Sequence, residues 1–282
     1  MRPGNSSRTY FDTHCHLDFA QFDADRAALW ADARSLGLRS VFIPGVSPAQ
    51  WQRLASIQSD IEGACVGVGL HPHFLSELDA SERASSIRQM SGLVTTLGAV
   101  AVGECGLDGR LPKRGGPSVD EQERALLPQL ELAVHLKLPV VLHVVDAHGR
   151  VLELLERLGP LPAGGVLHAY SGSAELVPRY CALGLYFGFG GAVTHERAAK
   201  ARRALACVPK ERLLLETDAP DQAPAGWTSQ SGVRRNEPAA LLAIAAVIAQ
   251  ILGISEDELA QRTTANAERL FRLAVKREPH AR

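Results

Sequence analysis

Two histidines separated by a single residue, His14 and His16 in the run FDTHCHLD, are the first residues with an evident chemistry. In an extended chain alternate side chains point to the same side, so both imidazoles face one object while Cys15 points away. Neutral imidazole is a common ligand for metal ions. The tripeptide alone is equally consistent with a shared metal ion and with two histidines that form hydrogen bonds inside a core.

Other residues of the kinds that bind metals stand at the ends of later apolar runs. They are His71 and His73 in GVGLHPH, Glu104 in AVGECGLD, His143 in PVVLHVVD, His168 in GVLHAYSG and Asp218 in LLLETDAP. Taken singly, each is more typical of a hydrogen-bonded structural residue or a helix cap. If they meet, burying them without metal would leave polar groups unpaired, at a cost of roughly 1–3 kcal/mol each. Even four of these six histidines, together with the two carboxylates, exceed one tetrahedral zinc site and suit two ions that share a bridging carboxylate.

The elements that must position these residues are short apolar strands that alternate with helices. Apolar, β-branched runs predict strands at 9–17, 40–46, 64–71, 100–107, 139–145, 165–170, 186–193 and 213–217. Helical spacing of apolar residues predicts helices at 26–36, 49–59, 81–97, 120–136, 149–158, 175–183, 196–207 and 237–252. One or two added helices are expected over 255–273, where Ser255 and Glu258 in SEDEL have the spacing of a capping box.

This order of elements predicts a (β/α)₈ TIM barrel, an α/β fold in which chemistry gathers at the carboxyl ends of the strands. A doubly wound open sheet is the alternative, but the first predicted strand ends in DTHCHLD, which has no glycine-rich phosphate loop. In the barrel all the residues named above share one rim. We expect one barrel domain over 9–275, a disordered leader at 1–8 and a tail at 276–282.

Composition narrows the function classes. The chain has 282 residues, 46% of them hydrophobic and 22% charged, and a net charge of −1, which argues against a general polyanion binder. Its five cysteines are odd in number and form no CxxC pair, which fits a reduced cytoplasmic compartment. No segment is apolar enough for a signal peptide or a membrane span, and no obligate protein partner is indicated.

The motifs DTHCHLD, GVGLHPH, GECGLD, HAYSGS, ETDAPDQAP and RRNEP, together with His143, resemble the TatD family of metal-dependent deoxyribonucleases in the amidohydrolase superfamily. The resemblance runs from about Phe11 to Phe271, and ETDAPDQ and HAYSGS are closer to the family's metal-dependent hydrolase branch than to TatD itself. It implies a TIM barrel, two divalent cations and hydrolysis of phosphodiester bonds in DNA. By this resemblance the first ion is held by His14, His16 and Asp218, and the second by His143 and His168, with Glu104 bridging both.

Two positions depart from the family pattern. The histidine of the fifth strand is usually followed by serine, arginine and aspartate, whereas here Val145 stands at the arginine position. Gly109 replaces a usual aromatic residue. The missing arginine predicts weak nuclease activity. The cations that could replace it are Arg110, Lys113 and Arg114 after the fourth strand and Arg234 and Arg235 after the eighth. Each of them is at least as consistent with a solvated basic surface.

The ligand set predicts hydrolysis by a metal-activated water, with Asp218 as proton acceptor. His73 is predicted to hydrogen-bond the substrate phosphate, or else to be a loop histidine. Imidazole-rich sites favour Zn, Mn or Ni, although nuclease chemistry often uses Mg or Mn. The alternative function is hydrolysis of a small amide, ester or lactone by the same two-metal site. A barrel without catalysis is disfavoured because the ligand set is complete.

Overall fold

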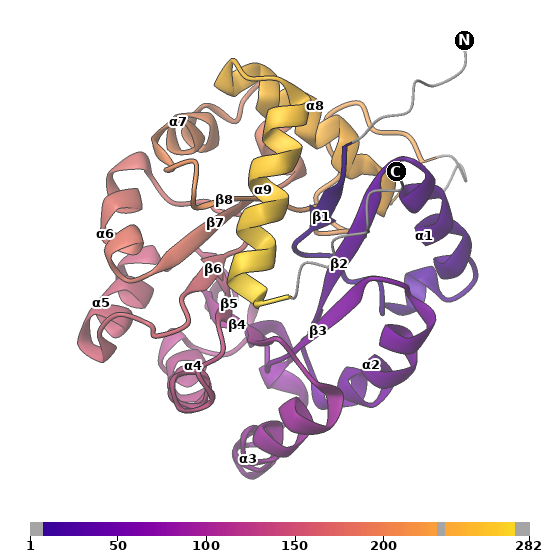
Figure 1. Ribbon diagram of the computed structural model, residues 1–282. Helices are drawn as coiled ribbons and strands as arrows, with labels where there is room; N and C mark the ends of the chain where they lie inside the picture. The colour runs from indigo at the N-terminus through magenta and orange to yellow at the C-terminus, as the bar shows by residue number, and fades with distance from the viewer. Residues whose placement is uncertain (1–7, 230–234, 274–282) are drawn as a thin grey trace.

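Eight parallel strands, hydrogen-bonded in chain order, form the centre of a computed structural model that describes residues 8–229 and 235–273. Their bounds are β1 Tyr10–Asp12, β2 Leu38–Gly45, β3 Ala64–Val68, β4 Ala101–Asp108, β5 Val140–Val145, β6 Gly165–Leu167, β7 Leu185–Phe189 and β8 Leu213–Leu215. Helices surround this ring of strands (Figure 1). The predicted (β/α)₈ TIM barrel is therefore confirmed.

Within the described ranges nine helices follow the predicted rhythm. They are α1 Arg26–Ser35, α2 Pro48–Asp60, α3 Ala80–Leu97, α4 Val119–Leu136, α5 His148–Leu158, α6 Val177–Ala182, α7 Ala199–Cys207, α8 Leu241–Leu252 and α9 Glu256–Phe271. No single helix among these residues is long and apolar enough to cross a membrane, although α8 and α9 pass that test jointly as a pair bent by 107°.

One buried apolar residue from each strand forms a layer inside the barrel. The layer consists of Phe11, Phe42, Cys65, Ala101, Val141, Val166, Tyr186 and Leu214. Because side chains alternate along a strand, positions two and four residues further on also point inward, at the carboxyl end. His143 and His168 stand two residues after their layer residues, and Asp218 stands four residues after Leu214. Strand periodicity thus explains why these polar side chains converge.

The first and last strands meet through backbone bonds that lie beyond their regular parts. Thr13 N donates to Leu215 O at 3.0 Å, Asp218 N donates to His14 O at 2.8 Å and His16 N donates to Ala219 O at 2.8 Å. The first strand is predicted over 9–17, but its regular part ends at Asp12. The next residues bond partly to β2, through Cys15 N and Phe42 O, and partly to the end of β8 and the segment after it. His14 and His16 therefore lie just past the strand, joined by backbone bonds to the segment that carries Asp218.

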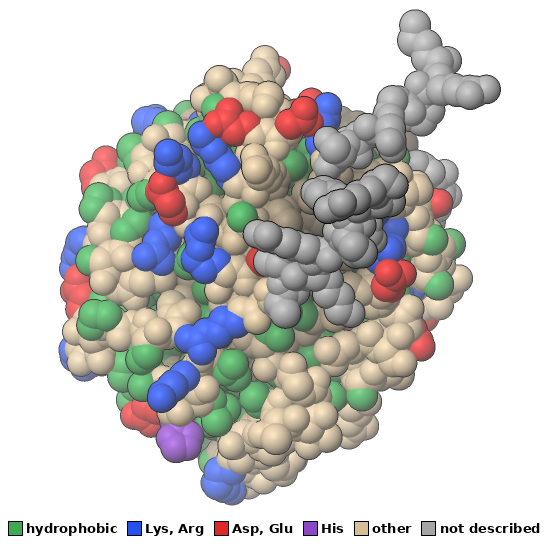
Figure 2. All heavy atoms as spheres, viewed as in Figure 1, with side chains coloured by type: hydrophobic (Ala, Val, Ile, Leu, Met, Phe, Trp, Pro, Cys, Tyr) green, Lys and Arg blue, Asp and Glu red, His purple; other side chains and the backbone are tan. Residues whose placement is uncertain are grey.

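Helix α9 closes the opposite end of the barrel. In Figure 1 it crosses in front of the strands, and its Phe271 ring stacks on Phe42 with ring centroids 4.7 Å apart. Ser255 caps this helix, since its hydroxyl accepts a bond from Glu258 N at 3.1 Å. Figure 2 views the same face, where Lys and Arg side chains lie among acidic and apolar ones. The strand ends that carry the histidines are on the other side.

Most of the expected leader and tail lies outside the described residues. Arg8, the last residue of the predicted leader, pairs with Glu256 and Asp257 at the start of α9. The boundaries of the leader, the barrel domain and the tail stay a prediction.

Candidate metal centre

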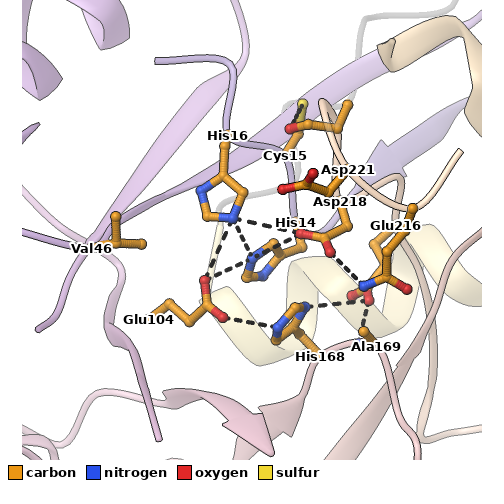
Figure 3. Close-up of polar contacts among 12 residues, drawn as sticks. His14, Cys15, His16, Val46, Glu104, His168, Ala169, Glu216, Asp218 and Asp221 are labelled. Atoms are coloured by element: carbon orange, nitrogen blue, oxygen red, sulfur yellow. Dashed lines mark hydrogen bonds and ion pairs between the residues drawn. The ribbon is translucent and has the colours of Figure 1, made fainter. Parts of the chain in front are cut away.

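Glu104, in the middle of β4, is surrounded by imidazoles (Figure 3). Its Oε2 lies 3.1 Å from His14 Nε2 and 3.6 Å from His16 Nε2. Its Oε1 is close to three further ring nitrogens, His168 Nε2 at 2.8 Å, His71 Nε2 at 3.2 Å and His143 Nδ1 at 3.2 Å. Each oxygen of this buried carboxylate therefore faces its own group of imidazoles.

Two of these imidazole pairs have the spacing of metal ligands. His14 Nε2 and His16 Nε2 are 3.3 Å apart, and His143 Nδ1 and His168 Nε2 are 3.2 Å apart. Two nitrogens that bind one tetrahedral Zn²⁺ at 2.0–2.1 Å stand about 3.3 Å from each other. One pair faces each oxygen of Glu104, so the donor set fits two cations bridged by this carboxylate.

Packing orients the rings of the first pair. The buried Nδ1 atoms of His14 and His16 have no hydrogen-bond partner within the described ranges. Instead, the His14 ring stacks on His168, with centroids 3.9 Å apart and an interplanar angle of 13°. The His16 ring packs against the Phe19 ring, with centroids 4.4 Å apart. These contacts point both Nε2 atoms toward Glu104.

Asp218 completes the first group. Its Oδ1 lies 3.5 Å from His16 Nε2 and 3.7 Å from His14 Nε2, while its Oδ2 accepts a 2.5 Å hydrogen bond from Gln222 Nε2. Burial alone would raise the pKa of this carboxyl, but the bond from His16 and the charge of His168 hold its pKa well below the usual range. Asp218 is therefore ionised, as a ligand or proton acceptor must be.

His71 supports the bridging carboxylate. Its Nδ1 accepts a bond from His73 N at 3.2 Å, so in the neutral ring the proton is on Nε2, which donates to Glu104 Oε1 at 3.2 Å. Burial lowers the pKa of His71 to about 3, which keeps the ring neutral. The sequence placed His71 at this rim without a role. The structure makes it a hydrogen-bond donor to Glu104.

Asp108 supports the second group and was not predicted. Its Oδ2 lies 2.9 Å from His73 Nε2 and 3.5 Å from His143 Nε2, the ring nitrogen that faces away from Glu104. A carboxylate behind a metal-binding histidine fixes the orientation of the ring and increases its basicity. The sequence did contain a signal for Asp108, because this carboxylate stands four residues after Glu104, at the end of the same strand.

Glu216, behind His168, was also missed. Its Oε1 accepts a bond from Ala169 N at 2.5 Å and lies 3.7 Å from His168 Nδ1 (Figure 3). The carboxylate has room because residue 188 is glycine, where an added Cβ would come within 2.1 Å of Glu216 Oε2. Its signal was periodicity, since Glu216 stands two residues before Asp218 on the inward side of the same segment.

Of the three residues predicted to contact the substrate, His73 lies at the metal centre. His73 is about half exposed, at 46%, and lines the cavity of about 150 Å³ that also contains Glu104 and Asp218. Arg234 lies outside the described residues. The side chain of Arg235 is only 10% exposed, pairs with Asp25 and has its Cζ 4.6 Å from the centroid of the Phe22 ring. Because Arg235 is engaged within the fold, the substrate-binding role predicted for it is not retained.

An eight-stranded barrel with imidazoles and carboxylates gathered at its carboxyl-terminal rim defines the class of metal-dependent hydrolases. The model of the TatD related DNase family matches residues 11–272, and the chain belongs to this family. The predicted resemblance is thereby confirmed.

Individual relatives cover nearly the whole chain. The 3'-5' ssDNA/RNA exonuclease TatD of Cronobacter sakazakii is 39% identical over 263 residues, which are 93% of this chain and 97% of that protein. The TatD exonuclease of Escherichia coli K12 is 37% identical over 94% of this chain and 99% of its own length. The crystal structure of YjjV, a TatD homologue from Escherichia coli K12, superposes with a TM-score of 0.83 at 32% identity, covering 94% of this chain and 98% of that one.

Proposed function

We propose that this protein removes nucleotides from the end of single-stranded nucleic acid and that it uses two divalent metal cations. The observation that carries the proposal is the facing imidazole pair on each oxygen of Glu104. His14, His16 and Asp218 would hold one cation, His143 and His168 the other, and Glu104 both. When bound, such cations supply a water of lowered pKa and an electrostatic clamp on the phosphate.

Charge at the centre favours a phosphodiester. Two divalent cations balanced by the carboxylates of Glu104 and Asp218 leave about +2 at the site, which matches an anionic substrate. The carboxylates of Asp108 and Glu216 stay behind the histidines, where they orient rings. A neutral carbonyl substrate would gain less from this excess of positive charge.

Asp218 is placed to take the proton of the attacking water. Its Oδ1 faces the nitrogens of His14 and His16, and its Oδ2 is held by Gln222, so the carboxylate cannot turn away from the centre. His73, at the mouth of the same cavity, donates from Nε2 to Asp108 at 2.9 Å and would donate from Nδ1 to a phosphate oxygen when its ring is protonated. Both assignments are part of the proposal.

The shape of the centre favours action at a chain end. The cavity between the ligands has a volume of only about 150 Å³, room for a phosphate and a few waters but not for a duplex. The relatives named above are described as 3'-5' exonucleases of single-stranded DNA and RNA. We therefore propose the same direction and substrate class here. Imidazole donors favour Zn, Mn or Ni over Mg, and the five free thiols suit a reducing cytoplasm.

One observation favours a second candidate, the hydrolysis of a small ester, amide or lactone. Val145 lines the larger cavity beside the metal centre, together with Val144 and Val193, so part of the approach to the cations is apolar. A small neutral substrate with an apolar group would fit this wall.

A substrate comparison on the metal-loaded protein tests the proposal. Single-stranded oligonucleotides labelled at either end, duplex DNA, a nitrophenyl ester and a lactone are incubated with wild type, Glu104→Gln and the matched surface control Glu131→Gln. We expect stepwise shortening from the 3' end that Glu104→Gln abolishes and Glu131→Gln retains. Turnover of the ester or lactone without any oligonucleotide cleavage would overturn the proposal in favour of the second candidate.

A further inference from the structure

A second, larger cavity adjoins the metal centre. Its volume is about 490 Å³, within the range of roughly 300–1,000 Å³ typical of ligand pockets. His143 and His168 line both this cavity and the smaller one that contains Glu104. A ligand that starts at the metal centre can therefore continue into the larger cavity without crossing the fold.

The wall of this cavity next to the metal centre is apolar. It is formed by Val144 and Val145 at the end of β5, by Phe189 at the end of β7 and by Ala192 and Val193 just after it. None of these side chains carries a charge or a hydrogen-bonding group. This part of the cavity suits the base and sugar of a nucleoside better than a phosphate.

The lining of the cavity also includes two cations, Arg197 and Lys200, just before and within the first turn of α7. Both are exposed, and across residues 8–229 and 235–273 neither has a carboxylate oxygen within 4.0 Å. Arg110, the remaining cation of the lining, is instead paired with Asp146 at 2.9 Å. Arg197 and Lys200 are thus positive groups that line a cavity and lack a counter-charge.

We propose that the larger cavity binds the nucleoside next to the scissile phosphate and that Arg197 and Lys200 bind the following phosphate of the strand. This inference rests on the proposed function and identifies the subsite that recognises a second nucleotide. It follows from the composition of one continuous lining, which combines metal ligands, an apolar wall and two cations without a carboxylate partner among the described residues. A single strand presents the groups that match them, a phosphate, a nucleoside and a further phosphate.

The subsite predicts a dependence on the number of phosphates. A dinucleotide has one phosphodiester, which occupies the metal centre, so it cannot reach Arg197 and Lys200 with a second phosphate. A tetranucleotide has further phosphates and can. Each phosphate contact to a single strand contributes about −0.7 to the slope of log affinity against log salt.

The test compares hydrolysis of d(TpT) and d(TpTpTpT) by three proteins. These are wild type, Arg197→Gln/Lys200→Gln, and the control Arg124→Gln/Arg203→Gln, which removes the same charge from exposed residues of α4 and α7 outside both cavities. For Arg197→Gln/Lys200→Gln we expect kcat/KM on the tetranucleotide to fall about ten- to a hundredfold, mainly through KM, because charge-assisted contacts are lost. Its salt slope should become shallower by about 0.7, because one phosphate contact is lost. Activity on the dinucleotide should stay within about twofold of wild type, and the control should match wild type on both substrates.

Three outcomes would overturn the inference. If the double variant behaves as the control does, these cations bind no phosphate. If it loses the dinucleotide and tetranucleotide activities equally, they act on the scissile phosphate rather than on the next one. If the metal-loaded wild type cleaves neither substrate, the proposed function itself fails and the subsite with it, which separates this result from the first two.

Discussion

At the scale of single residues, the two carboxylate oxygens of Asp218 make different contacts. Oδ1 faces His16 Nε2 at 3.5 Å, and Oδ2 is held by Gln222 at 2.5 Å. Asp218→Asn retains the shape and one oxygen donor but cannot accept a proton. We expect kcat to fall about 10²–10⁴-fold while the fold and most of the bound metal remain.

The measurement for Asp218→Asn is kcat and metal content on the same sample. The group of His143, His168 and Glu104 should lose the least metal, since Asp218 does not contact it. An active variant with normal metal content would remove Asp218 from proton transfer and direct attention to His73.

Val145 is the residue where a cation would change substrate preference. Its side chain lines the larger cavity beside His143, so Val145→Arg places a guanidinium next to the metal centre. One charge-assisted contact to phosphate is worth about 1.5–3 kcal/mol, so oligonucleotide cleavage should rise roughly ten- to a hundredfold. Val145→Gln, which adds a polar chain without the charge, is the control and should give little gain. Equal rates for the two variants would contradict this role.

The lowered pKa of His148, a residue that is not a proposed metal ligand, predicts that the stability of the protein depends on pH. Burial, with a smaller effect of the Lys200 charge, lowers the pKa of His148 to about 4 from 6.5. Between these values the unfolded chain binds a proton that the folded protein does not, so this contribution to stability is present above pH 6.5 and is lost as the pH falls toward 4. His148→Gln can keep hydrogen bonds to Tyr180 and Ser171. In urea unfolding across this window its stability should fall less with acid than that of wild type, and parallel curves would contradict the assignment.

Most of the proposed ligands were predictable because they depend on chain periodicity and on strand ends. His143, His168 and Asp218 are inward-facing positions of strands whose apolar pattern marks the barrel. The supporting contacts of His71 and Asp108 could not be predicted, because they depend on which ring nitrogen accepts a bond and on strands that meet only in the fold. The charge of Arg235 was visible in the sequence, but its burial against Asp25 was not.

At the scale of elements, the helices were easier to predict than the strands. Helix α9 begins at Glu256, directly after the predicted cap Ser255. Several strands are shorter than predicted, since β8 ends at Leu215 and β6 at Leu167, whereas the predictions continue to 217 and 170. Beyond these points the chain is still inward-facing and makes single backbone bonds, from His168 N to Leu142 O of β5 and from Asp218 N to His14 O after β1. The apolar sequence pattern therefore predicts which residues are buried, but it does not predict how far the regular hydrogen bonding between strands extends.

Helix α9 should contribute stability without contributing to chemistry. Phe271 is 2% exposed and packs on Phe42 and Phe11 at the end of the barrel opposite Glu104. We expect Phe271→Ala to lower the free energy of unfolding by about 3–5 kcal/mol. Leu127→Ala, at an exposed position of α4, is the control and should cost little. Urea unfolding measures both. Loss of bound metal from a Phe271→Ala protein that is still folded would contradict this division of roles.

At the scale of the whole molecule, the two ends of one barrel have different tasks. Aromatic packing under α9 closes the amino-terminal end, and the carboxyl-terminal end carries the imidazoles, the carboxylates and both cavities. With a net charge of −1 the protein as a whole does not attract nucleic acid strongly. Attraction would instead come from the bound cations and from Arg197 and Lys200, so substrate capture should require the metal-loaded protein.

The central claim is a two-cation centre bridged by Glu104, and calorimetric titration of the metal-free protein with Mn²⁺ or Zn²⁺ tests it most directly. Wild type and the surface control Glu131→Ala should each bind two ions per chain. Glu104→Ala should bind fewer ions, and more weakly, because both imidazole pairs lose their shared carboxylate. Failure of the wild-type protein to bind either ion, or equal binding of two ions by Glu104→Ala, would contradict the claim.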